Sequence, residues 1–84
     1  MSTGSAPSKE GIGAAIERYL RANPLAADTA KGIATCWLPW PGLEPAYEPF
    51  VEALQTMVES RQLRTFELPG GALLYGRGPG FAPD

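Results

Sequence analysis

A short helical pattern near the middle of the chain organises the elements around it: Asp28-Thr-Ala-Lys-Gly-Ile-Ala-Thr-Cys-Trp-Leu38. Its apolar residues recur at the spacing of one helix face, namely Ala30, Ile33, Ala34 and Trp37. Asp28 has the chemistry of an N-cap, and the pattern stops at Pro39, because a residue ahead of proline is pushed out of the helical region. We therefore predict a short helix over residues 29–38, with Trp37 as a packing residue.

Helical patterns also lie on either side of this stretch. The earlier pattern covers residues 9–22, with Ser8 as the N-cap and Asn23-Pro24 as the end. The later one is entered at Glu44-Pro45 or Glu48-Pro49 and ends near residues 60–62. Their apolar stripes are Ile12, Ile16, Tyr19 and Leu20 in the first, and Phe50, Val51, Leu54, Met57 and Val58 in the second.

A β-hairpin is predicted after the third helix. Two short apolar runs, residues 63–68 and 72–77, flank Pro69-Gly70-Gly71, which is a typical turn sequence. We expect Phe66 and Leu68 to share a face with Leu73 and Tyr75. The predicted core joins the helices to the hairpin and contains Ile16, Leu20, Ile33, Leu54, Val58 and Phe66.

The expected fold class is mainly α with a small β-hairpin. Residues 9–77 form the predicted domain, since 84 residues with 44% hydrophobic content have room for one core. Residues 1–8 and 78–84 are expected to be flexible tails, because both are short end segments without a periodic apolar pattern.

The order and spacing of these elements resemble the bacterial winged helix-turn-helix superfamily. Residues 28–34 resemble its Thr-x-x-x-Ile-Ala pattern, residues 50–58 resemble its recognition helix, and Leu63 leads into a hairpin that would be the wing. The resemblance spans residues 12–77 and implies a three-helix winged helix-turn-helix fold. Ser60-Arg61-Gln62 stands where members usually have glycine, so we expect the exit from the third helix to be distorted or longer.

Composition argues against several classes of function. The net charge of −2 provides no general cationic field that would attract nucleic acid. His is absent, Cys36 is the single cysteine, and no residues have metal-ligand spacing, so we expect no enzyme, metal or cofactor. Cys36 is expected to be a small buried hydrophobe. The chain has no apolar run of membrane-spanning length and no signal-peptide pattern at its start, which favours the cytoplasm.

The third helix and its approach carry four carboxylates and no neighbouring cation. No Lys or Arg occurs between Lys31 and Arg61, whereas the acidic residues there are Glu44, Glu48, Glu52 and Glu59. The last three share one helical stripe with Gln55. A helix in the major groove usually presents Arg, Lys, Asn or Gln, and its affinity depends on neutralised phosphates. The stripe is therefore either a solvated helix face or a contact surface for another protein.

Two further groups of residues are candidate contacts. Trp40 lies between two prolines in the connector over residues 38–42, where a rigid aromatic ring is either an interface anchor or a cap on the core. Arg61, Arg64 and Arg77 would gather at the base of the hairpin if Arg64 and Arg77 pair across its strands. Such a cluster would contact phosphates or form salt bridges.

Two functions follow from these observations. The favoured one is a non-catalytic winged-helix module that binds another protein through the acidic third helix, the Trp40 connector, or both. The alternative is a DNA-binding transcriptional regulator whose Arg-bearing wing contacts phosphates. A homodimer is compatible with either function.

Overall fold

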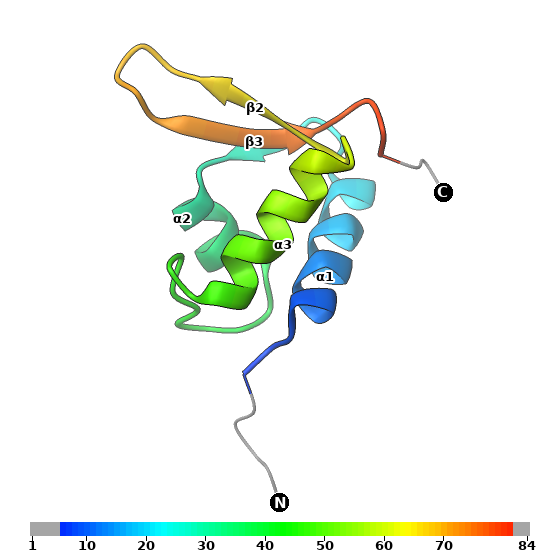
Figure 1. Ribbon diagram of the computed structural model, residues 1–84, viewed down its shortest axis with the longest axis vertical. Coiled ribbons are helices and arrows are strands. Elements are labelled where there is room, and N and C mark those ends of the chain that lie inside the picture. Colours follow the sequence, from blue (N-terminus) through cyan, green and yellow to red (C-terminus); the bar gives the residue numbers. More distant parts are fainter. Residues whose placement is uncertain (1–5, 82–84) are drawn as a thin grey trace, which may run out of the picture.

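The computed structural model describes residues 6–81 and contains three helices and a small three-stranded antiparallel sheet. The sheet lies across the C-terminal ends of α1 and α3, and the connector between the second and third helices lies at the opposite end (Figure 1). In chain order the elements are α1 (Lys9–Ala22), β1 (Ala27–Asp28), α2 (Ala30–Gly32), the π-helical segment η1 (Ile33–Trp37), α3 (Glu48–Glu59), β2 (Leu63–Glu67) and β3 (Leu73–Arg77).

The first helix begins and ends where the sequence predicts. Ser8 is its N-cap, and the Ser8 Oγ accepts a hydrogen bond of 3.0 Å from the Gly11 backbone N–H. At the other end, the Asn23 backbone N–H donates to the Tyr19 carbonyl at 2.8 Å. The tail predicted before this helix is engaged at Pro7, whose carbonyl accepts from the Tyr47 hydroxyl at 2.9 Å; residues 1–5 of it lie outside the described residues.

The second helix has a different cap from the one predicted. Thr29 is the N-cap, since its Oγ1 accepts from the Gly32 N–H at 3.1 Å. Asp28 instead belongs to β1, opposite Tyr75 in β3, and its carboxylate accepts from the Thr29 N–H. The helix continues into η1 and ends at Trp37, so the predicted range is confirmed to within a residue at each end.

The residue that follows the C-cap of the third helix has a left-handed backbone conformation although it is not glycine. Arg61 has a φ of 66°, and the Arg61 and Gln62 N–H groups donate to the Val58 and Met57 carbonyls. These two bonds form the helix-ending motif that glycine usually supports. The expected distortion is therefore confined to one strained residue, at a cost of about 1–2 kcal/mol, and the exit is of ordinary length.

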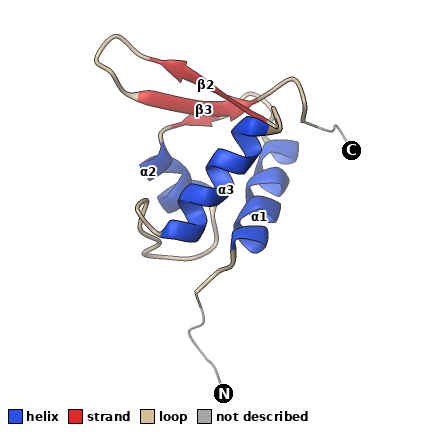
Figure 2. Ribbon diagram, viewed as in Figure 1, coloured by secondary structure: helices blue, strands red, loops and turns tan. Residues whose placement is uncertain are grey.

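The sheet has one strand more than predicted, because Ala27–Asp28 joins the hairpin as β1. β3 is central, and the strand order is β1-β3-β2 (Figure 2). At the hairpin turn, Gly71 has a φ of 91° and its N–H donates to the Leu68 carbonyl. The Leu68 N–H donates to Ala72, so the loop between them has three residues.

This loop sets a register that corrects the predicted faces of the hairpin. Phe66 pairs with Leu74, and Thr65 pairs with Tyr75. Because directly paired residues share a face, Phe66 lies on the outer face and Tyr75 on the inner face, toward α3. The prediction that the two aromatic rings share a face was wrong. Phe66 is also not in the core, since 38% of it is exposed.

The core otherwise follows the helical stripes. Ile16, Leu20, Ile33 and Leu54 are buried as predicted, whereas Val58 is half-buried against the core. Cys36 is exposed, which corrects the expected burial: Ile33, Ala34 and Trp37 fill the inward side of η1 and leave Cys36 outside. The complete buried set is Ile12, Ala15, Ile16, Leu20, Ile33, Ala34, Trp37, Leu38, Phe50, Ala53, Leu54, Met57, Leu63 and Phe81.

The segment after β3 packs against the turn between α3 and β2. The Gly78 N–H donates to the Gln62 carbonyl at 2.9 Å and the Gly80 N–H to the Arg61 carbonyl at 2.7 Å. Phe81 is buried beside them. The part of the chain expected to be a flexible tail from residue 78 is therefore packed as far as Phe81; residues 82–84 lie outside the described residues.

Candidate protein-interaction surface

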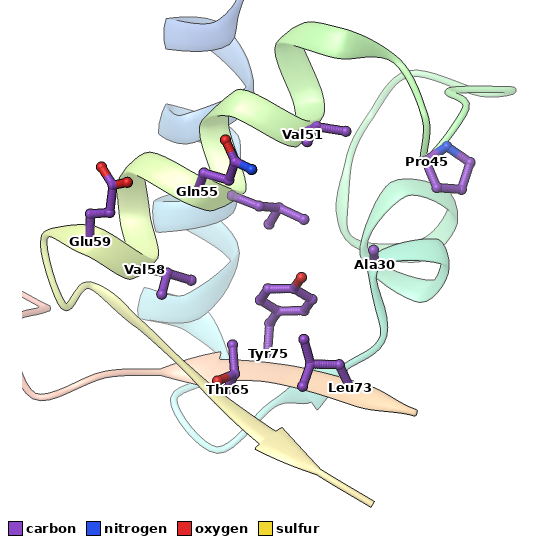
Figure 3. A pocket seen from close by; sticks show the side chains of 10 residues that line it. Ala30, Pro45, Val51, Gln55, Val58, Glu59, Thr65, Leu73 and Tyr75 are labelled. Atoms are coloured by element: carbon purple, nitrogen blue, oxygen red, sulfur yellow. The ribbon is translucent and has the colours of Figure 1, made fainter. Parts of the chain in front are cut away.

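A groove lies between α3 and the inner face of the hairpin. It has a volume of about 490 Å³, within the range of ligand-binding clefts. One wall is α3, the other is β2 and β3, and the α2 end of the molecule closes one side (Figure 3). The groove is lined by Ala30, Pro45, Val51, Leu54, Gln55, Val58, Glu59, Thr65, Leu73 and Tyr75.

The walls of the groove are apolar and accessible. Val51 on α3 and Leu73 on β3 are 37% and 41% exposed, although both are large hydrophobic residues. Thr65, Leu73 and Tyr75 face α3 because the hairpin register places them on the inner face. An accessible apolar hollow of this kind, bordered by polar groups, is typical of an interaction site.

The border of the groove is acidic. Glu59 and Gln55 line it, and Glu67 pairs with Leu73 and so extends the same inner face toward the hairpin turn. All four members of the predicted stripe on α3 are exposed: Glu48, Glu52, Gln55 and Glu59. Among the described residues that line the groove, none is Lys or Arg. The stripe therefore meets the apolar groove at Gln55 and Glu59, while Glu48 and Glu52 lie on α3 outside the lining. We call the groove together with this stripe the acidic groove.

The chain matches no protein-family model, no curated protein and no solved structure. Function is therefore inferred from the geometry and chemistry of the acidic groove.

The predicted basic cluster at the hairpin base is not formed. Arg64 pairs with Gly76 and Arg77 pairs with Leu63, so the two guanidinium groups belong to opposite faces of the sheet. The Arg64 guanidinium carbon lies 4.7 Å from the centre of the Phe66 ring, and that of Arg77 lies 5.3 Å from the centre of the Phe81 ring. Both arginines thus stack on aromatic rings, a contact worth about 0.5–1 kcal/mol at exposed sites. Arg61 is exposed in the turn that precedes β2.

The two tryptophans differ in burial, and the prediction that Trp37 is a packing residue is confirmed. Trp37 is 7% exposed and stacks on Tyr19, with 4.6 Å between ring centres and 14° between ring planes. Trp40 is half-buried against the core, and its carbonyl accepts from the Leu43 N–H in a turn. Trp40 and the exposed Glu44 lie between η1 and α3 in the sequence, and neither lines the groove.

Residues 6–81 contain no group of three or more His, Cys, Asp or Glu side chains that could hold a metal ion. Over the same residues, no helix combines the length and apolar character needed to cross a membrane.

The hairpin half of the acidic groove was missed by the sequence analysis. Thr65, Leu73 and Tyr75 belong to a short alternating pattern that was assigned to the wrong faces. The three-residue loop is the feature that could have corrected the register, because Pro69-Gly70-Gly71 suits a turn that ends on a left-handed glycine. On α3, the helical spacing predicts Val51 as part of the apolar stripe, whereas it lies at the exposed edge of that stripe.

Proposed function

We propose that this chain is a winged-helix domain that binds another protein through the acidic groove. The observation that carries the proposal is the exposed stripe of Glu48, Glu52 and Glu59 beside an accessible apolar hollow. Three helices followed by a hairpin are the order that the winged-helix resemblance implies, with α3 in the position of the recognition helix.

The charge of α3 argues against DNA as the partner. A helix in the major groove lies between two rows of phosphates, and each phosphate contact normally depends on Lys or Arg. On α3 the solvent face instead presents three carboxylates, and the 12 residues of this helix include no Lys or Arg. Bringing this face to a duplex would place like charges together without a compensating cation.

The apolar centre of the acidic groove argues for a protein as the partner. Val51, Leu73 and the half-buried Tyr75 would each lose further contact with water under a bound polypeptide. Burying apolar surface contributes about 25 cal/mol per Å² before the costs of association. A partner with apolar side chains at the centre and cations at the edge would match both features of this surface.

A second candidate is the DNA-binding regulator, with the wing rather than α3 making the contacts. Arg61, Arg64 and Arg77 are all exposed, and Arg64 lies on the outer face of the hairpin. Since the register separates Arg64 from Arg77, these cations do not form one continuous phosphate-binding patch.

A DNA titration separates the two candidates. We expect random-sequence duplex DNA to bind more weakly than about 10⁻⁴ M at physiological salt, measured by fluorescence anisotropy at 50 and 200 mM salt. Low-micromolar binding that persists at 150 mM salt and is lost in Arg64→Ala, but is kept in the control Arg18→Ala on α1, would support the regulator and overturn our proposal.

A further inference from the structure

The outer edge of β2 offers free backbone groups to another strand. The Leu68 N–H donates to the Ala72 carbonyl, and the Gly78 N–H donates to the Gln62 carbonyl. The even-numbered residues of β2 are therefore the ones whose backbone groups bond to β3. Hydrogen-bonded and non-hydrogen-bonded pairs alternate along an antiparallel ladder. The N–H and C=O groups of the odd-numbered residues Leu63, Thr65 and Glu67 therefore point away from β3. Over residues 6–81, no strand pairs with this edge, since β2 is the last strand in the order β1-β3-β2.

This edge is also the border of the acidic groove. Thr65 of β2 lines the groove together with Leu73 and Tyr75 of β3, and Figure 3 shows β2 passing in front of β3. A strand added beside β2 would lie about 4.8 Å from it and would direct every second side chain to the inner face. Those side chains would enter the space between the hairpin and α3.

We propose that the acidic groove binds an extended segment of a partner protein, which adds to β2 as a fourth strand and places alternate apolar side chains against α3. This inference rests on the proposed protein-binding function and names its binding mode. The segment carries Lys or Arg next to its apolar residues, because Glu59 borders the groove and Glu67 lies on the same face as Leu73.

Charge distinguishes this partner from a second copy of the chain. A second copy would present the same carboxylates, Glu59 and Glu67, and the described lining of its groove has no Lys or Arg to pair with them. Like charges facing one another across adjacent strands are destabilising. A cationic segment would instead be attracted by the stripe on α3 and would pair its backbone with Thr65 and Glu67.

The binding mode can be tested with a displayed library of random dodecapeptides, selected on the full chain and counter-selected on Leu73→Lys. We expect the enriched peptides to alternate apolar residues with Lys or Arg. Enrichment of acidic peptides, of peptides with apolar residues every three or four positions, or of nothing beyond the counter-selected pool would overturn the proposal.

Matched variants then test the site with one enriched peptide, using anisotropy to measure the dissociation constant. Leu73→Lys should weaken binding at least tenfold, whereas Leu68→Lys, at a residue that is equally 41% exposed but lies on the outer face, should change it less than twofold. Thr65→Pro removes an outward N–H without breaking a bond to β3, so it should also weaken binding tenfold, whereas Thr65→Ala should not.

Amide hydrogen exchange gives a readout that side-chain contact alone would not change. On peptide binding, the Thr65 and Glu67 amides should become protected, and unchanged exchange there would overturn strand addition. If the peptide binds but Leu73→Lys and Thr65→Pro behave as wild type, this binding mode is wrong while protein binding stands. If duplex DNA displaces the peptide at 150 mM salt, the proposed function itself is wrong.

Discussion

Replacing Trp37 by Ala is expected to lower the midpoint of thermal unfolding by at least about 12 °C. Trp37 is 7% exposed and stacks on Tyr19, so its removal leaves a large cavity and an unpaired ring. Substitutions of this kind cost about 3–5 kcal/mol, and each kcal/mol corresponds to roughly 4–8 °C in a domain of this size. Circular dichroism at 222 nm during heating measures the change.

The matched control is Trp40→Ala, which removes the same side chain from a half-buried position in the connector. We expect it to shift the midpoint by less than half as much, because less surface and fewer contacts are lost. An equal loss in the two variants would place Trp40 in the core and would exclude it as an interface anchor.

Replacing Gly78 by Ala is the second change expected to have a large effect. An added Cβ would meet the Arg61 carbonyl and lie 2.9 Å from the Leu63 carbonyl carbon, both of which are backbone groups that a rotamer change cannot move. Relief of this clash would break the 2.9 Å hydrogen bond from the Gly78 N–H to Gln62 and displace Phe81. We expect a loss of about 3 kcal/mol, the sum of overpacking and a broken buried hydrogen bond, measured by urea denaturation.

Gly13→Ala is the control for this prediction. Gly13 lies inside α1, and an added Cβ would meet nothing within 4 Å. Alanine there should stabilise the chain by about 0.5–1 kcal/mol, since glycine loses more backbone entropy in a helix. If Gly78→Ala is as harmless as Gly13→Ala, the segment after β3 does not pack on the α3–β2 turn as described.

The helices could be predicted from the sequence because their apolar residues repeat over several turns. In α1, Ile12, Ile16 and Leu20 lie on one face of the helix, and the N-cap at Ser8 fixes the start of the helix. The acidic stripe on α3 follows from the same period, so its exposure was predictable once Phe50 and Leu54 were assigned to the core. Caps and helical periods depend on residues that are close together in the sequence, so they can be predicted from the sequence directly.

The sheet could not be derived in the same way. Its faces depend on whether the hairpin loop has two or three residues, and a shift of one residue exchanges them. β1 has two residues and exists because Asp28 meets Tyr75, a contact between distant parts of the chain. The acidic groove depends on both features, since Thr65, Leu73 and Tyr75 face α3 only in this register. The exposed acidic face of the helix was therefore predicted, whereas the hollow beside it was not.

Photo-crosslinking from Gln55 determines whether the acidic groove contacts a protein. A benzophenone side chain in place of Gln55 would sit on the exposed face of α3 and at the border of the acidic groove, and the same group in place of the exposed Ala14 on α1 is the control. After irradiation in an extract of the source cells, we predict an adduct from position 55 that protease removes and nuclease does not, with none from position 14. An adduct from position 55 that nuclease removes, or equal protein adducts from both positions, would show that the acidic groove is not a protein-binding site.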